Sequence, residues 1–165
     1  MKRRVLLLLL EFVLLTVPLG WLWIKWGRLA YLDFFVKVST PVFIALGVTE
    51  LPVQLVIDHF INYVPFIVLI AITPELTIKR RIVGLVVGFV ILFVCHIALT
   101  SLAFLAVSNY GQSQKAFSTI FPGLLVNDSM PFILWAVIAG SYLKRLIGKT
   151  SKKSVETKKS STKKR

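Results

Sequence analysis

The chain has few acidic residues and only one cysteine. Asp and Glu account for seven of its 165 residues, against 20 Lys and Arg, which gives a formal net charge of +13. The single cysteine, Cys95, excludes a disulfide bond within the chain. Only 16% of the residues are charged, whereas 56% are hydrophobic, and the mean hydropathy is +0.81. A water-soluble core of this size cannot enclose so much apolar surface, so the composition indicates an integral membrane protein.

The sequence also lacks the familiar catalytic signatures. It has no phosphate-binding loop, no G-x-S-x-G and no H-E-x-x-H motif. A metal centre needs three or four converging ligands. Two histidines and two aspartates on three segments could supply them, but we predict no metal site and no cofactor.

Apolar windows of about 20 residues predict the membrane crossings. The first runs from Val5 to Ile24 and has no small-residue cleavage site, so we expect an uncleaved span rather than a signal peptide. The second begins near Leu55 and ends at Thr73, and the third runs from Ile82 to Val107. The last is short, from Pro131 to Leu143. We expect a turn at Pro122-Gly123 before it, and a helix cap from Asp128 or Ser129.

The segment from Phe34 to Val48 is apolar but short, and it contains Lys37 and Pro41. These features favour an interfacial or re-entrant element over a full span, although the sequence leaves open whether it crosses, dips or lies flat.

The basic residues predict the orientation of the chain. With four crossings and both termini in the cytoplasm, 16 of the 20 Lys and Arg lie on the cytoplasmic side. A fifth crossing would move either the N-terminal basic cluster or the lysine tail outside. The predicted fold is therefore an all-α polytopic membrane bundle of four transmembrane helices plus an interfacial or re-entrant segment, in the inner (plasma) membrane.

The chain divides into a transmembrane domain, residues 1–148, and a polybasic tail, residues 149–165. The tail has eight basic residues and one Glu with no apolar periodicity, which predicts disorder. Beside a membrane, each lysine gains about 1 kcal/mol from anionic lipid headgroups. We therefore expect the tail to bind such headgroups and to fix topology, and we predict no nucleic-acid partner.

Polar residues of three predicted spans fall at one depth. His96 lies ~21 Å above Ile82, in the outer third of a hydrocarbon core ~30 Å thick. The same depth on the second span falls near Phe60, and on the last near Ser129. This comparison predicts an outer polar cluster, a name used below for Asp58, His59, Asn62, Cys95, His96, Asn127 and Asp128.

The neighbours Cys95 and His96 do not form a catalytic dyad in this interpretation. Adjacent residues point about 100° apart around a helix, so the thiol and the imidazole face different ways. We expect Cys95 to pack as a small buried hydrophobe. An ionisable group inside a membrane is a functional hypothesis by default, but a neutral His96 bonded to Asn62 or to a carbonyl satisfies the same physics.

Gly84 and Gly88 lie four residues apart in the third span. This small-xxx-small spacing permits close helix packing, and it could serve docking to a membrane partner.

The run from Phe66 to Leu102, FIVLIAITPELTIKRRIVGLVVGFVILFVCHIALTSL, resembles the central part of the exosortase and archaeosortase membrane proteases. In that family an apolar helix leads to a basic turn, then to a Gly-containing helix that ends in an Asn-x-x-Arg pattern. The resemblance covers about half of the chain. Among the small non-catalytic relatives encoded with these sorting systems, the chain most resembles the exosortase H-associated membrane proteins.

The resemblance also implies which positions to compare. The family's catalytic Cys aligns with the stretch from Asp58 to Phe60, its Asn with His96, its Arg with Leu99, and its His with Asn127 or Asp128. All three catalytic identities are missing. The resemblance therefore implies a non-enzymatic accessory subunit that binds a membrane partner such as an exosortase-type protease. The alternative is a divergent membrane hydrolase or small carrier that uses the outer polar cluster.

Overall fold

The computed structural model describes residues 2–48, 56–74 and 76–144, which form helices and the turns between them, with no strand among them. In chain order the elements are α1 (Lys2–Leu22), the π-helical turn η1 (Trp23–Gly27), α2 (Arg28–Ala45), the 3₁₀-helical turn η3 (Ile57–Asn62), α3 (Tyr63–Ile72), α4 (Ile78–Tyr110) and α5 (Gln114–Ile138). The predicted all-α class is confirmed. The polybasic tail, residues 149–165, lies outside the described residues.

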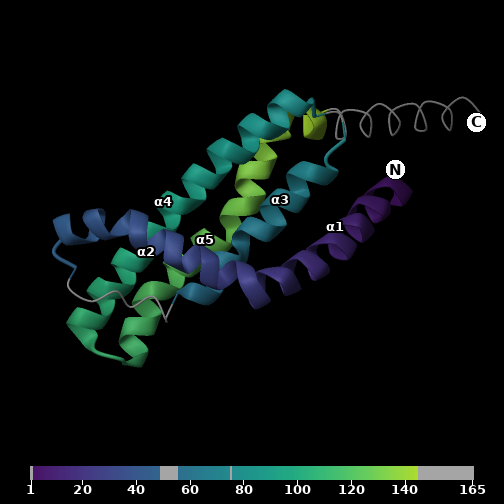
Figure 1. The fold of residues 1–165 in the computed structure, drawn as a ribbon. Coiled ribbons are helices and arrows are strands. Elements are labelled where there is room, and N and C mark those ends of the chain that lie inside the picture. Colours follow the sequence, from purple (N-terminus) through teal and green to yellow (C-terminus); the bar gives the residue numbers. More distant parts are fainter. Residues whose placement is uncertain (1, 49–55, 75, 145–165) are drawn as a thin grey trace, which may run out of the picture.

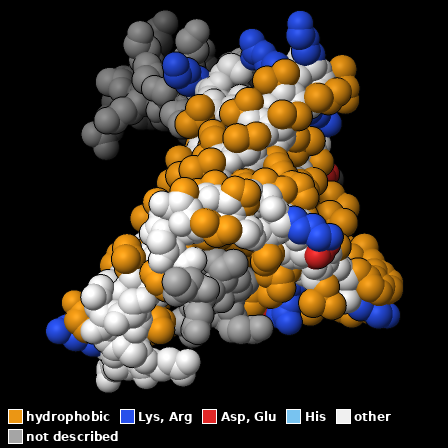
Figure 2. All heavy atoms as spheres, turned by 60° about the vertical axis from the view of Figure 1, so that its left-hand side comes forward, with side chains coloured by type: hydrophobic (Ala, Val, Ile, Leu, Met, Phe, Trp, Pro, Cys, Tyr) orange, Lys and Arg blue, Asp and Glu red, His pale blue; other side chains and the backbone are white. Residues whose placement is uncertain are grey.

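Three helical stretches are long and apolar enough to cross a membrane. They are Leu6–Ala45, Ile78–Tyr110 and Gln114–Ile138, and a further apolar stretch, Ile57–Ile72, is shorter. Figure 2 shows hydrophobic side chains covering the narrow middle of the molecule, while Lys and Arg gather at its upper end and at a few points below. Helices satisfy their own backbone hydrogen bonds, which apolar surroundings require. The fold is that of a helical membrane protein.

The N-terminal helices form one continuous path that bends at η1. In this turn the backbone N–H of Arg28 bonds to the carbonyl of Trp23, five residues earlier, which is the π-helical pattern. Figure 1 shows α1 running beside α3, and α2 then crossing over α4 in a new direction.

The segment from Phe34 to Val48 thus lies, up to Ala45, in this crossing helix. The ring contacts between α2 and α4 are confined to a short part of α2, as expected for two helices that cross. They join Tyr31, Phe34 and Phe35 to Phe89, Phe93 and His96.

Helices α4 and α5 form an antiparallel hairpin (Figure 1). Gly111 ends α4 with a positive φ of 61°, a conformation that costs glycine little. Ser113 begins α5, since its hydroxyl accepts the backbone N–H of Ala116 at 3.4 Å. Small residues are buried on both helices near this end, including Ala103 and Ala116, so the two backbones approach closely.

The predicted turn at Pro122-Gly123 is wrong, and so is the predicted cap at Asp128 or Ser129. Helix α5 runs from Gln114 to Ile138 without a break. A Cβ on Gly123 would lie 2.8 Å from Leu102 of α4, so this glycine permits close helix packing and does not form a turn. Membrane helices tolerate an internal proline where a neighbouring helix pairs with the carbonyl that it frees.

Gly84 and Gly88 serve packing inside the chain. Both are buried, and a Cβ on Gly84 would lie 3.1 Å from Ile138 of α5. A Cβ on Gly88 would overlap the ring of Phe66 on α3. Within the described residues α3 and α5 pack on this face, and docking of a separate partner through it stays a prediction.

Candidate functional site

The buried core of the molecule contains a hydrogen-bonded histidine. His96 of α4 has no exposed surface, and its Nε2 lies 3.0 Å from Oδ1 of Asn62. Its Nδ1 lies 2.7 Å from the hydroxyl of Tyr31. The ring of Phe60 stacks on the imidazole, with centroids 4.2 Å apart. Both ring nitrogens therefore have partners, one from η3 and the other from α2.

The partners fix the direction of each proton around His96. The side-chain amide of Asn62 donates from Nδ2 to the carbonyl of Asn127 at 3.1 Å, and a carbonyl can only accept. Oδ1 of Asn62 must then face His96, so Nε2 of the imidazole is the donor. Burying a charged imidazole against these uncharged partners would be costly, so Nδ1 carries no proton and accepts from the hydroxyl of Tyr31. The arrangement describes a neutral imidazole protonated at Nε2.

Tyr63 extends this network. Its hydroxyl lies 3.2 Å from that of Tyr31 and 3.3 Å from the carbonyl of Phe89. Because Tyr31 gives its proton to His96, Tyr63 supplies the donor between the two hydroxyls or bonds to the carbonyl. Through Tyr63, the hydrogen-bonded network around His96 thus reaches the backbone of α4.

Proline explains why Asn62 can bond to α5. In a regular helix the N–H of residue 131 would bond to the carbonyl of residue 127, but Pro131 has no N–H. The carbonyl of Asn127 is left free of this bond and accepts from Asn62. In return, Nδ2 of Asn127 donates to the carbonyl of His59 at 3.2 Å. Two asparagines thus clamp η3 to α5.

The outer end of the cluster is a contact between a histidine and a carboxylate at the surface. Nδ1 of His59 lies 2.9 and 3.1 Å from the carboxylate oxygens of Asp128, and both side chains are partly exposed. Asp58 instead pairs with Arg28 at 2.6 Å and has no bond to the other members of the outer polar cluster among the described residues. Five members of the outer polar cluster are therefore linked in one network: His59, Asn62, His96, Asn127 and Asp128.

Cys95 is a free thiol of intermediate exposure on a different side of α4 from the fully buried His96. The adjacent pair does not meet, in line with the angular argument from the sequence. Within the described residues, no group of three or more His, Cys, Asp or Glu is placed to hold a metal ion.

Sequence reasoning missed three partners of the cluster: Tyr31, Tyr63 and Arg28. Tyr63 directly follows Asn62, and a tyrosine in an apolar segment usually finds a partner for its hydroxyl. That signal was present for both tyrosines. The bend that brings Tyr31 of α2 next to His96 is not indicated as clearly by the sequence.

A second polar contact joins the helices at their other end. The hydroxyl of Thr73, at the end of α3, accepts the indole N–H of Trp135 of α5 at 2.7 Å. Arg81 of α4 donates to the carbonyl of Thr73 at 3.0 Å. This anchor joins the end of α3 to α4 and α5, and the outer polar cluster joins η3, which directly precedes α3, to the same two helices.

No family model, no curated protein and no solved structure matches the chain.

Proposed function

We propose that the chain is a non-enzymatic, multi-pass protein of the inner (plasma) membrane that acts as an accessory subunit of an exosortase-type protein-sorting system. In this proposal the short stretch Ile57–Ile72 completes four crossings with the three long apolar helices. Both termini lie in the cytoplasm, and α2 lies at the outer side of the bilayer.

The burial of His96 and the hydrogen bonds within the outer polar cluster support a non-catalytic role. Phe60 and Asn127 are at positions that align with the proteases' catalytic Cys and His, and His96 is at the position of their Asn; these three side chains lie in or against one network. His96 is fully buried, and both of its nitrogens are engaged. A base or nucleophile must reach its substrate, so the geometry favours helix clamping over chemistry at this position.

The alternative, a divergent membrane hydrolase or small carrier, would act through the partly exposed pair of His59 and Asp128. A histidine whose Nδ1 is oriented by a carboxylate supplies two of the three members of a catalytic triad. The nearest hydroxyl in sequence, on Ser129, donates to the carbonyl of Leu125 at 2.7 Å instead. The structure therefore favours the accessory role.

Helix α1 offers the surface that best fits a membrane partner. No residue between positions 6 and 30 is buried, while α1 packs along α3 on one side. Leu14 is 62% exposed on this helix. Helix association within a bilayer depends on such lateral packing surfaces, so we place the partner against α1.

A photo-crosslinking residue at Leu14 should trap one discrete, larger complex in native membranes. The matched control is Val90, which is 55% exposed on α4, and it should give no such adduct. The double variant His59→Gln, Asp128→Asn should leave the yield of the complex unchanged, because the accessory role does not use this pair. Finding only monomer at Leu14 and its α1 neighbours would overturn the proposal, and loss of function in the double variant would favour the hydrolase or carrier.

The proposed topology predicts a labelling pattern. In a Cys95→Ser background, a membrane-impermeant maleimide applied to spheroplasts should modify cysteines placed at Lys25 or Lys115. It should leave cysteines at Lys79 or Lys144 unmodified until the membrane is opened. We expect at least a tenfold difference in labelling rate, since the bilayer separates the two pairs. Equal labelling of Lys79 and Lys25 positions from outside would refute the four-crossing orientation.

A further inference from the structure

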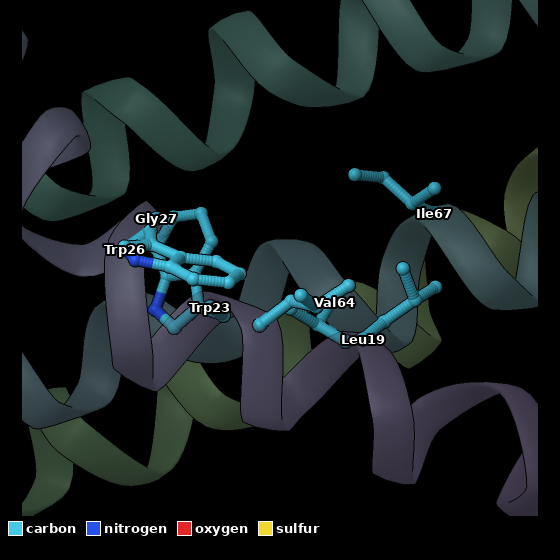
Figure 3. A pocket seen from close by; sticks show the side chains of 7 residues that line it. Leu19, Trp23, Trp26, Gly27, Val64 and Ile67 are labelled. Carbon is cyan, nitrogen blue, oxygen red and sulfur yellow. The ribbon is translucent and has the colours of Figure 1, made fainter.

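An apolar groove lies between the bend of the N-terminal helix and α3. It has a volume of about 360 Å³ and is lined by Leu19, Trp23, Trp26, Gly27, Val64 and Ile67, among others. Figure 3 shows the two indoles at one end of the groove and the aliphatic side chains of Leu19, Val64 and Ile67 along it. The lining is almost wholly hydrocarbon, so the groove fits an acyl chain and offers nothing to a polar ligand.

Trp26, which lines the groove, also contacts a cation. The ammonium group of Lys25 lies 4.8 Å from the ring centroid of Trp21 and 4.7 Å from that of Trp26. The π-helical turn brings these two indoles, five residues apart, within 6.0 Å of each other. Trp26 therefore belongs both to the groove and to the platform that positions the ammonium group.

Lys25 is available to an anion. Among the described residues it has no carboxylate partner, whereas Arg28 is paired with Asp58 and Lys37 is paired with Asp33. Tryptophan and lysine at the end of a membrane helix lie at the level of lipid headgroups. A phosphate at that level would meet Lys25, while the chain attached to it would enter the groove.

We propose that this groove is a binding site for an anionic phospholipid. One acyl chain lies along Leu19, Val64 and Ile67, and the negatively charged phosphodiester pairs with Lys25. The apolar lining accepts the acyl chain of any membrane lipid, so Lys25 confers the preference for an anionic headgroup. The site does not depend on the proposed contact with a protein partner.

Quenching of tryptophan fluorescence by brominated lipids tests the site directly, because the walls of the groove carry the fluorophores. The full-length chain is reconstituted into phosphatidylcholine bilayers, and either brominated phosphatidylglycerol or brominated phosphatidylcholine is titrated in. We expect half-maximal quenching at an about fivefold lower mole fraction of the anionic lipid, the preference that one basic residue gives at a membrane surface.

Three variants separate the headgroup from the acyl chain. Lys25→Gln should abolish the preference for the anionic lipid, while Lys37→Gln, a matched loss of charge on α2, should retain it. Ile67→Phe should reduce quenching by both lipids, since the added ring fills the groove. The lysine tail and Trp135 are the same in all variants, so neither can produce these differences.

Equal quenching of the unmodified chain by the two lipids would overturn the assignment of an anionic ligand. A preference that survives in Lys25→Gln would also overturn it, and unchanged quenching in Ile67→Phe would remove the acyl-chain site.

Discussion

Replacing His96 with phenylalanine should lower the free energy of unfolding by about 1–3 kcal/mol. The variant keeps a ring against Phe60 but leaves Oδ1 of Asn62 without a partner, and the hydroxyl of Tyr31 keeps only its contact with Tyr63. A buried polar group that loses its partner costs about 1–3 kcal/mol, and hydrogen bonds between membrane helices fall at the lower end of this range. Reversible unfolding in lipid bicelles, followed by tryptophan fluorescence, measures the loss.

The neighbouring residue provides the control. Cys95→Ala alters the same helix one position earlier, where the free thiol is partly exposed, and we expect a change of less than about 0.5 kcal/mol. If His96→Phe proved no more costly than Cys95→Ala, the imidazole would not be the centre of the hydrogen-bonded network described here.

Substituting alanine for Gly88 should destabilise the bundle by about 1–3 kcal/mol, the usual cost of overpacking. The added methyl group would overlap the ring of Phe66, which is itself buried. The same bicelle measurement applies. Combining Gly88→Ala with Phe66→Leu should recover at least half of the loss, because the smaller side chain makes room for the methyl group.

Gly20 of α1 is the matched glycine. A Cβ there would meet nothing within 4 Å, so Gly20→Ala should be neutral or gain up to about 1 kcal/mol from the better helix propensity of alanine. Equal losses at both glycines would show that the cost belongs to the helix backbone and not to the contact between α4 and α3.

Most of the outer polar cluster could be predicted from helix geometry alone. A fixed rise per residue relates sequence position to depth, so the comparison placed His96 level with Phe60 and with the start of the last predicted span. The structure stacks His96 on Phe60 and joins Asn62 to the backbone of Asn127. It also shows the bond between His96 and Asn62 that was one of the two alternatives for a neutral histidine.

The two prolines of α5 do not end the helix, for a physical reason. Pro122 and Pro131 remove backbone donors, which in water would end a helix. In α5 the helix continues, because Gly123 packs closely on α4 and Asn62 pairs with the carbonyl that Pro131 leaves open. These compensations come from other helices, so the local sequence of α5 does not reveal them.

The angle between α1 and α2 was equally hidden. It arises in the π-helical turn WIKWG, where Gly27 has a low helix propensity, but a single glycine does not specify a π-helical turn. The amphipathic pattern of α2 is weak because the side chains on its lipid-facing side and those on its protein-facing side are both mostly apolar. Tyr31 therefore could not be assigned to the cluster before the crossing of α2 over α4 was known.

The bond between Tyr31 and His96 imposes an order on biosynthesis. The two residues are 65 positions apart, with Tyr31 nearer the N-terminus. At a synthesis rate of about 5–20 residues per second, Tyr31 leaves the ribosome on the order of 3–13 s before its acceptor. During that interval its hydroxyl must be hydrated or bound elsewhere. Helix α2 can therefore reach its final position only after the ribosome has synthesised α4. The packing of α2 on α4 is thus a late step in the folding of this protein.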